Sequence, residues 1–236
     1  MKNLKKLISL AVPVILLLAG LGLLVYPRFS EWWNERISSR AVAAYTEAAA
    51  VQADFESIWE AAREYNAALN KIGSAQAIYS PESVGRDYEG TLDITGTGIM
   101  GYITIEKIGV ELPVYHGTDD AVLRIAAGHL EGSSLPTGDE GTHVVLTGHS
   151  GLPSAKLFTD LDQLQIGDTF TLTVLDRTFT YEIDQIKIVL PSEITDLYIE
   201  EGIAYCTLIT CTPYGVNSHR LLVRGSKMMD QDSGLK

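Results

Sequence analysis

The second half of the chain consists of short runs rich in β-branched and aromatic residues, separated by residues that favour turns. These runs predict strands over 101–106, 111–115, 142–147, 169–175, 178–190, 203–210 and 219–225. Asp176-Arg177 stands between two alternating runs, as in a two-residue hairpin. Only two short helical pieces are expected here, over 119–127 and 154–161. Many short strands with little helix between them predict a mainly β domain, either a barrel or a sandwich.

The N-terminus predicts a membrane anchor. Lys2, Lys5 and Lys6 precede an uncharged run from Leu7 to Tyr26. At ~1.5 Å per residue, this run matches the ~30 Å hydrocarbon core of a bilayer. The preceding lysines place residues 1–6 in the cytoplasm and the rest of the chain outside. We therefore expect a single-pass protein of the cell membrane, with a signal anchor over residues 7–26.

A cleaved signal peptide is the alternative interpretation of this run. Tyr26-Pro27-Arg28-Phe29 lacks the small residues of a cleavage site, and Ala41-Val42-Ala43 lies too far downstream. Tyr26, Trp32 and Trp33 suit the outer membrane interface, although tryptophans on a helix pack into a core as often.

The segment between the apolar run and the strands divides in two. Residues 27–72 are predicted to form a stalk packed on the domain, and residues 29–72 of this stalk are predicted to be helical. Its apolar positions have helical spacing: Ala44, Ala48, Val51, Phe55, Ile58, Trp59, Ala62, Tyr65 and Leu69. Gly73 is predicted to end the helix. The helical spacing of apolar residues is absent from residues 73–97, which are therefore predicted to be a loop. A polar tail is expected over 226–236.

Charge and cysteine content exclude some functions. The net charge of −12 argues against nucleic-acid binding, which needs clustered basic residues. Cys206 and Cys211 lie in one extended run, where their Cα atoms would be ~16 Å apart, too far for a disulfide. Their odd spacing puts them on opposite faces, so Cys206 is interpreted as a small buried residue.

Three chemically capable side chains stand at the edges of predicted strands. Cys211 ends one strand, His149 follows another, and Arg220 opens a third. A thiol nucleophile, an imidazole acid/base and a cation for an oxyanion are the parts of covalent acyl transfer. Taken alone, a cysteine, histidine or arginine at such a position is more often structural than catalytic. His116, His129, His143 and His219 are the alternatives to His149 as the acid/base.

No metal or other cofactor is expected. No two histidines have the spacing of a helical zinc site, and there is no cysteine cluster. Asp160, Asp162 and Asp168 lack the alternation of a calcium loop and are interpreted as solvated acids. Arg224 is interpreted as a structural or surface residue.

Several separated motifs resemble the sortase family. Thr207-Leu208-Ile209-Thr210-Cys211 with Asn217-Ser218-His219-Arg220 resembles the cysteine and arginine strands of sortases. The histidine segment resembles class C, the pilin-joining type: Leu146-Thr147-Gly148-His149, Gly151-Leu152-Pro153 and Leu157-Phe158-Thr159-Asp160-Leu161. Further similar segments are Gly101-Tyr102-Ile103-Thr104-Ile105, Leu112–Thr118 and Gly128–Gly132.

The resemblance implies an eight-stranded barrel over residues 98–225, with Cys211, His149 and Arg220 catalytic and His116 and His129 structural. It implies a cysteine transpeptidase that cleaves a Leu-Pro-x-Thr-Gly-like sorting signal of a surface or pilin protein. The acyl group would pass to an amine, a pilin lysine in class C or a cell-wall precursor in housekeeping sortases. A thiol hydrolase and a membrane-tethered binding module remain the alternatives.

The chain departs from the class C pattern in two places. Class C enzymes usually carry a lid with Asp-Pro-aromatic, whereas the nearest candidate here is Ser80-Pro81-Glu82. Residues 73–97 are therefore the candidate lid, and we expect it to be held only loosely over the site. Glu82 is the residue of this segment that is expected to pair with Arg220. Class C chains often end in a second membrane span, whereas residues 226–236 are polar.

Overall fold

The computed structural model describes residues 2–151 and 155–229, with side chains described from residue 12 onward. Its α-helices are α1 (Lys2–Val51), α2 (Glu56–Ile72), α3 (Ser74–Tyr79) and α4 (Asp120–Leu123). Its strands are β1 (Ile99–Ile105), β2 (Val110–His116), β3 (Ala127–His129), β4 (Thr142–Thr147), β5 (Thr169–Val174), β6 (Arg177–Val189), β7 (Ala204–Thr212) and β8 (His219–Lys227). The 3-10 helices are η1 (Pro81–Val84), η2 (Glu106–Ile108), η3 (Leu161–Gln163) and η4 (Thr195–Leu197).

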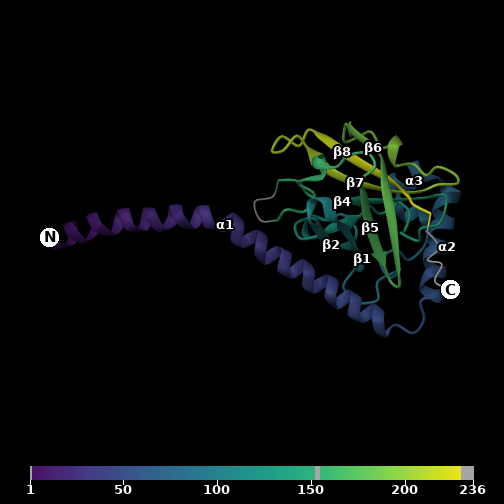
Figure 1. Cartoon of the computed structure of the whole chain (residues 1–236), viewed down its shortest axis with the longest axis horizontal. Helices are drawn as coiled ribbons and strands as arrows, with labels where there is room; N and C mark the ends of the chain where they lie inside the picture. Colours follow the sequence, from purple (N-terminus) through teal and green to yellow (C-terminus); the bar gives the residue numbers. More distant parts are fainter. Residues whose placement is uncertain (1, 152–154, 230–236) are drawn as a thin grey trace.

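The strands close into one barrel in the order β1-β2-β3-β4-β7-β8-β6-β5, which confirms the expected eight-stranded, mainly β fold (Figure 1). The β2–β3 and β4–β7 pairs are parallel, and the other pairs are antiparallel. Alternation places one face of each strand inside. In β7, for example, Cys206 and Leu208 are buried in the barrel core, whereas Cys211 is half-buried on the other face.

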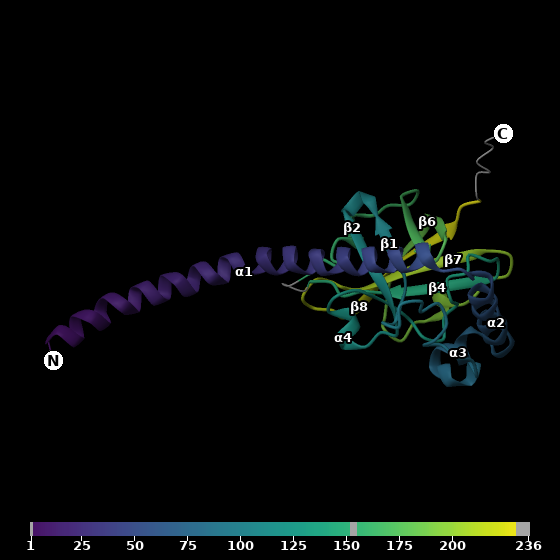
Figure 2. The same ribbon diagram turned by 90° about the horizontal axis from the view of Figure 1, so that it is seen from below.

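α1 is a single helix that includes both the apolar run and the first part of the stalk. It extends far from the barrel and bends along its length (Figures 1 and 2). Pro27 lies inside it, and a proline removes one helical hydrogen bond and crowds the preceding turn, which accounts for a bend. Among the described residues, one helix is long and apolar enough to cross a membrane, and its apolar window is unburied.

The stalk is not one continuous helix, so the prediction of helix throughout 29–72 is wrong at residues 52–55. Asp54 Oδ1 accepts the N–H of Ser57 at 3.1 Å, an interaction typical of a new helix start. Because of this break, the buried residues of α1 and those of α2 do not follow one continuous helical spacing. In α1 this stripe is Ser38, Val42, Tyr45 and Ala49, whereas the predicted Ala44 is exposed and Val51 is 80% exposed.

α2 carries the buried stripe that the sequence predicts: Trp59, Ala62, Tyr65 and Leu69. The indole N–H of Trp59 donates to Asp176 Oδ1 at 2.9 Å. The β5–β6 hairpin has the two-residue loop expected, but it is shifted by one residue to Leu175-Asp176, because Val174 pairs with Arg177. Helix docking explains the shift, since the N–H of Leu175 also donates to Tyr45 Oη at 2.9 Å.

Residues 73–97 are not a structureless loop, because they contain α3 and η1. Val84, Tyr88 and Leu92 are buried in the main core, so the expectation of a loosely held segment is wrong there. The Tyr88 hydroxyl lies 2.9 Å from His129 Nδ1 and accepts the N–H of Gly117 at 2.9 Å. These contacts hold the segment on the barrel wall.

Two other local expectations are corrected. The predicted helix over 119–127 is shorter, because α4 ends at Leu123 and Ala127 begins β3, which pairs with β2 and β4. In the predicted helix over 154–161, residues 157–160 form turns and Leu161 begins η3, while residue 154 lies outside the described residues. β8 continues to Lys227, because the long β6 pairs with it to that point, and residues 230–236 of the expected tail lie outside the described residues.

Candidate active site

Cys211 and Arg220 are direct partners across the β7–β8 pair. Residues directly opposite each other in an antiparallel pair project from the same face, with Cβ atoms ~4.5–5.5 Å apart. Both side chains are half-buried. Because of this register, Cys211 and Arg220 stand side by side close to the strand ends.

His149 reaches the same place from β4. Thr147, the last residue of β4, pairs in parallel with Ile209 of β7, so continuing this register by two residues brings His149 level with Cys211. Two bonds fix the intervening glycine: the Gly148 N–H donates to Ile209 O at 3.0 Å, and Thr210 Oγ1 donates to Gly148 O at 2.8 Å. The His149 side chain is 31% exposed, which leaves it accessible to a substrate.

One nitrogen of the Arg220 guanidinium donates hydrogen bonds to backbone carbonyls of the β7–β8 turn and of the adjacent residue. Its Nη1 donates to Asn217 O at 3.3 Å and to His219 O at 3.1 Å. Nε and Nη2 have no hydrogen-bond partner among the described residues, so donors remain for a substrate oxygen. An arginine presents these donors in a rigid fork, which suits a carbonyl oxygen that becomes negatively charged.

A carboxylate that the sequence reasoning did not assign lies beside the imidazole. Asp120 Oδ1 is 3.8 Å from His149 Nε2, and Asp120 Oδ2 also lies 2.5 Å from Arg124 Nη2. Asp120 is the first residue of α4. Its place next to His149 follows from the parallel packing of β3 beside β2, which local patterns do not reveal.

The loop after His149 lies against the β7–β8 turn. Gly151 has a positive φ of 77°, and a Cβ there would lie 2.8 Å from the Tyr214 ring. A side chain is therefore excluded by both conformation and space. Leu152 and Pro153 of the same motif lie outside the described residues. The histidine and the cysteine–arginine pair are thus joined by direct packing.

The other histidines occupy structural positions. His116 lies between two carbonyl oxygens, Gly98 O and Thr91 O, at 2.9 and 2.8 Å from its ring nitrogens. His129 and His143 are buried in the barrel wall, and their ring nitrogens contact Ser134 O and Thr207 Oγ1 at 2.9 and 2.7 Å. The interpretation of His116 and His129 as structural fits these contacts.

The buried histidines predict acid sensitivity of the fold. Burial lowers the pKa of His129 to about 3 and that of His143 to about 4, against an ordinary value of about 6.5. At a pH between the folded-state pKa and 6.5, each of these histidines is protonated in the unfolded chain but not in the folded chain. The free energy of unfolding is therefore greatest above pH 6.5 and falls as the pH drops below it. By pH 5 we expect a loss of about 2 kcal/mol for each histidine.

Urea unfolding of the detergent-solubilised chain at pH 7 and pH 5 measures this loss. His219→Gln is the matched control, because His219 is only half-buried and its Nδ1 contacts the neighbouring Ser218 Oγ. This variant should keep the pH dependence of the parent, whereas His143→Gln should reduce it. An unfolding free energy that stays constant from pH 7 to pH 5 would contradict the assignment.

Cys206, Arg224 and two of the acids considered for calcium have structural surroundings. Burial raises the pKa of the Cys206 thiol, which keeps it protonated. Arg224 pairs with Asp184 at 3.0 Å and lies over the Tyr205 ring at 4.0 Å, in agreement with a structural role. Of the acids considered for calcium, Asp160 pairs with Lys156 at 2.9 Å and Asp168 with Lys107 at 2.6 Å.

A closed β-barrel with an accessible thiol, an imidazole and a guanidinium at three neighbouring strand ends defines a protein equipped for thiol-based acyl chemistry. Residues 103–228 match a family model described as "Sortase domain". This match covers more than half of the chain, and the chain belongs to the sortase family.

Solved structures of sortases resemble about four fifths of the chain. Sortase C1 from Streptococcus agalactiae is 48% identical, covers 81% of this chain and 99% of its own, and has a TM-score of 0.76. A pilus-related sortase C of Group B Streptococcus is 37% identical over 79% of this chain and 96% of its own, with a TM-score of 0.70.

A curated relative, "Sortase D" of Bacillus subtilis (strain 168), is 31% identical over 131 residues. The matched stretch is 54% of this chain and 63% of that relative, which is less than two thirds of its length.

Proposed function

We propose that this chain is a membrane-anchored cysteine transpeptidase that cleaves a Leu-Pro-x-Thr-Gly-like sorting signal between Thr and Gly. The acyl group passes to an amine, and a pilin lysine is the favoured acceptor. The observation that carries the proposal is the direct pairing of Cys211 with Arg220, with His149 level with them on the neighbouring strand. The similarity to class C and pilus-related sortases supports the pilin acceptor.

In the first half of the reaction, the Cys211 thiolate attacks the threonine carbonyl carbon and forms a C–S bond. The carbonyl electron pair moves onto oxygen, where the free donors of Arg220 stabilise the charge. Collapse of this intermediate breaks the Thr–Gly bond. His149, as imidazolium, gives its proton to the departing glycine nitrogen, and a thioester remains on Cys211.

In the second half, the acceptor amine attacks the thioester carbonyl. Neutral His149 takes a proton from the attacking nitrogen, and Arg220 again holds the oxyanion. The C–S bond breaks, an amide forms, and the thiolate–imidazolium state of Cys211 and His149 is restored. The side chains that are needed all come from this chain, and the steps balance without a cofactor.

Mass spectrometry of the full chain in detergent tests the proposal. The protein is incubated with a Leu-Pro-x-Thr-Gly peptide and with one of three acceptors: Nα-acetyl-lysine amide, triglycine or water alone. A product joined to the lysine side chain supports the pilin acceptor. A triglycine product would favour cell-wall attachment, and a free acid alone would favour a thiol hydrolase. No thioester and no cleavage would favour a tethered binding module.

The proposed topology has its own test. In intact cells, added protease should remove an epitope fused after Lys236 and spare one fused before Met1, because the lysines at the N-terminus hold that end inside. The mature protein should retain the segment from Met1 to Tyr26. A mature N-terminus near Ala43 would instead show that the apolar segment is a cleaved signal peptide.

A further inference from the structure

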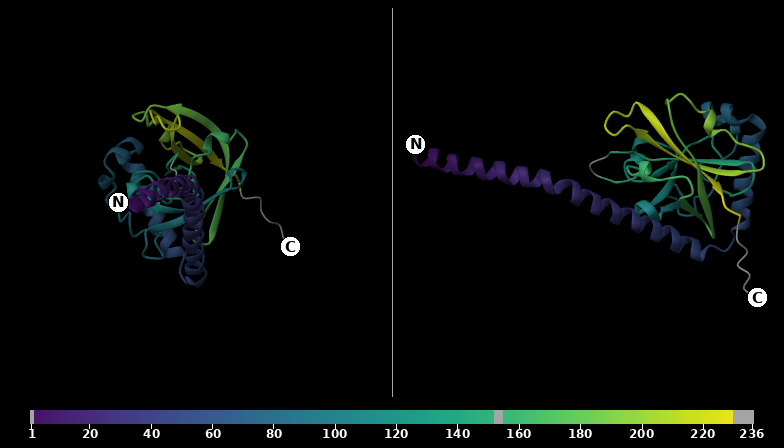
Figure 3. Two further views of the ribbon diagram at one scale, coloured as in Figure 1. Left: turned by 90° about the vertical axis from the view of Figure 1, so that its left-hand side faces the viewer. Right: turned by 45° about the horizontal axis from the view of Figure 1, so that its top comes forward.

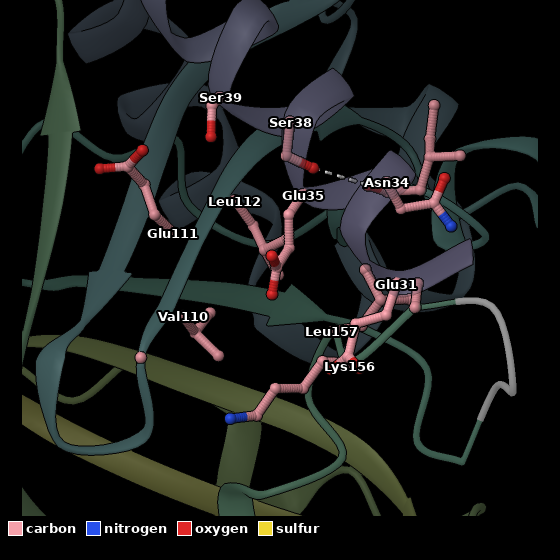
Figure 4. Close-up of a pocket in the computed structure, with 13 residues that line it drawn as sticks. Glu31, Asn34, Glu35, Ser38, Ser39, Val110, Glu111, Leu112, Lys156 and Leu157 are labelled. Atoms are coloured by element: carbon pink, nitrogen blue, oxygen red, sulfur yellow. Dashed lines mark hydrogen bonds between the residues drawn. The ribbon is translucent and has the colours of Figure 1, made fainter. Parts of the chain in front are cut away.

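The part of α1 that follows the apolar run has two chemically different faces. One face lies on the barrel. Its residues Glu31, Glu35 and Ser38 line a pocket of about 300 Å³ together with barrel residues that include Leu112 and Lys156 (Figure 4). Ser38 is buried and its Oγ donates to Ile125 O at 3.4 Å, so this face is fixed against the barrel.

The opposite face carries Phe29, Trp32, Trp33, Arg36 and Arg40, which we call the aromatic–arginine face. At 100° per residue these five positions fall on one side of the helix. Phe29, Trp32 and Trp33 are 56%, 49% and 51% exposed, yet their ring centroids lie only 6.0–6.3 Å apart. Three neighbouring aromatic rings thus form a patch that the rest of the described chain does not cover.

The arginines are arranged to act together with these rings. The Arg36 guanidinium lies 5.6 Å from the centroid of the Trp32 ring, in cation–π range. Trp32, Trp33, Arg36 and Arg40 line a shallow hollow with Ile37. Side chains on a helix lean toward its N-terminus, which here is the end with the apolar run. Long arginine side chains can therefore reach back toward a membrane surface.

The two faces differ in charge close to the apolar run. The chain has a net charge of −12, and Glu31 and Glu35 line the barrel-side pocket, although Glu35 also borders the hollow that contains Trp32, Arg36 and Arg40. The exposed side carries arginines and aromatic rings. Tryptophan favours the lipid headgroup level, and basic side chains near a bilayer attract anionic lipids. The patch is also continuous along α1 with the apolar window that is able to cross a membrane.

We infer that the aromatic–arginine face of α1 lies in the outer membrane interface and contacts the phosphates of anionic phospholipids. This inference rests on the membrane anchoring proposed above and adds a lipid-contacting surface beyond the span. Its partner is the lipid surface itself, because the patch continues an apolar span and its basic charge complements anionic headgroups.

This contact would orient the catalytic end of the barrel. The segment Leu157-Phe158 connects α1 with the candidate site. Leu157 lines the pocket under α1, and the N–H of the next residue, Phe158, donates to His149 O at 3.1 Å. The far end of the barrel carries α2 and α3, where Asn70 Nδ2 donates to Gly141 O at 3.3 Å. Figure 3 shows α1 leaving the barrel on the side away from α2. The candidate site is thereby held on the membrane-proximal side.

Tryptophan quenching in nanodiscs tests the inference with the full chain. The discs contain equal phosphatidylcholine and phosphatidylglycerol, with bromine on the acyl chains of one lipid at a time. Trp59 is buried in the core and serves as the internal reference. The Trp32→Phe/Trp33→Phe variant retains only this reference, so its signal is subtracted from that of the parent. We expect the subtracted emission to be quenched at least twofold more by brominated phosphatidylglycerol than by brominated phosphatidylcholine.

The arginines are tested with paired variants. Arg36→Gln/Arg40→Gln should abolish the preference for brominated phosphatidylglycerol. Arg63→Gln/Arg86→Gln is the matched control, because these arginines pair with Glu56 and Glu64 on α2, and it should retain the preference. Equal quenching by both lipids in the parent would overturn the headgroup assignment.

Retention of the chain after alkaline washing separates the two proposals. A chain that stays in the disc but shows no quenching of Trp32 and Trp33 would overturn the interfacial contact while leaving the anchor intact. A chain that washes out of the disc would overturn both.

Discussion

Cys211→Ala is expected to abolish both peptide cleavage and the thioester adduct while the protein remains folded. Cys211 lies at the exposed end of β7, so replacing its sulfur opens no cavity in the core. No other described sulfur is able to take over, because Cys206 is fully buried. Removal of a covalent nucleophile eliminates the acyl-enzyme pathway altogether rather than slowing one step of it.

Cys206→Ala is the matched control for this prediction. It removes one sulfur from the barrel core and should lower stability by about 1 kcal/mol or slightly more, without loss of turnover. Intact-mass spectrometry with a sorting-signal peptide detects the adduct, and thermal unfolding detects the fold. A folded but inactive Cys206→Ala protein beside an active Cys211→Ala protein would reverse the assignment.

The strands could be predicted because their pattern is local. Each of these runs is rich in β-branched and aromatic residues, some such as β5 also alternate between core and surface, and seven of the eight strands coincide with a predicted run. The missing one, β3, has only three residues, Ala127, Gly128 and His129, and its alternation is too short to detect. Its strand conformation depends on pairing with β2 and β4 on either side, which is a property of the closed barrel.

The helical part was less predictable because its elements are defined by what they dock against. The buried stripe of α2 could be read from spacing, whereas that of α1 includes a polar residue, Ser38, whose burial depends on the Ile125 carbonyl. Residues 73–97 looked like a loop because their apolar side chains have no period. Tyr88 is nevertheless buried, because its hydroxyl and ring contact His129 and His116.

The candidate site was predictable to a similar degree. Cys211, His149 and Arg220 each stand at the edge of a predicted strand, and the register of β4, β7 and β8 places them together. Asp120 was not assigned, since only the folded chain brings α4 beside the end of β4. Arg224 could be separated from Arg220 by its position further along β8, and its contacts with Asp184 and Tyr205 support that distinction.

His149→Ala and Arg220→Ala are each expected to lower kcat/KM by at least ~10²-fold, through different steps. Loss of the imidazole removes the proton donor for the departing glycine, an effect of ~10²–10⁴-fold. Loss of the guanidinium removes an oxyanion donor, an effect of ~10²–10³-fold in kcat. The two are distinguished by adduct formation with a small thiol reagent, which needs no oxyanion donor. Arg220→Ala should therefore react with the reagent at a rate closer to that of the parent than its peptide turnover is.

Arg220→Lys separates charge from geometry. A lysine restores a positive charge beside Cys211 but offers a compact ammonium in place of the planar fork. Because the Arg220 Nη1 bonds already tie one nitrogen to Asn217 O and His219 O, the remaining nitrogens must reach the substrate oxygen, and an ammonium cannot do both at once. We therefore expect less than about tenfold recovery over Arg220→Ala, whereas Arg224→Lys, four residues along the same strand, should leave turnover near that of the parent. Full turnover by Arg220→Ala would remove this residue from the mechanism, because the oxyanion would then be held by other donors.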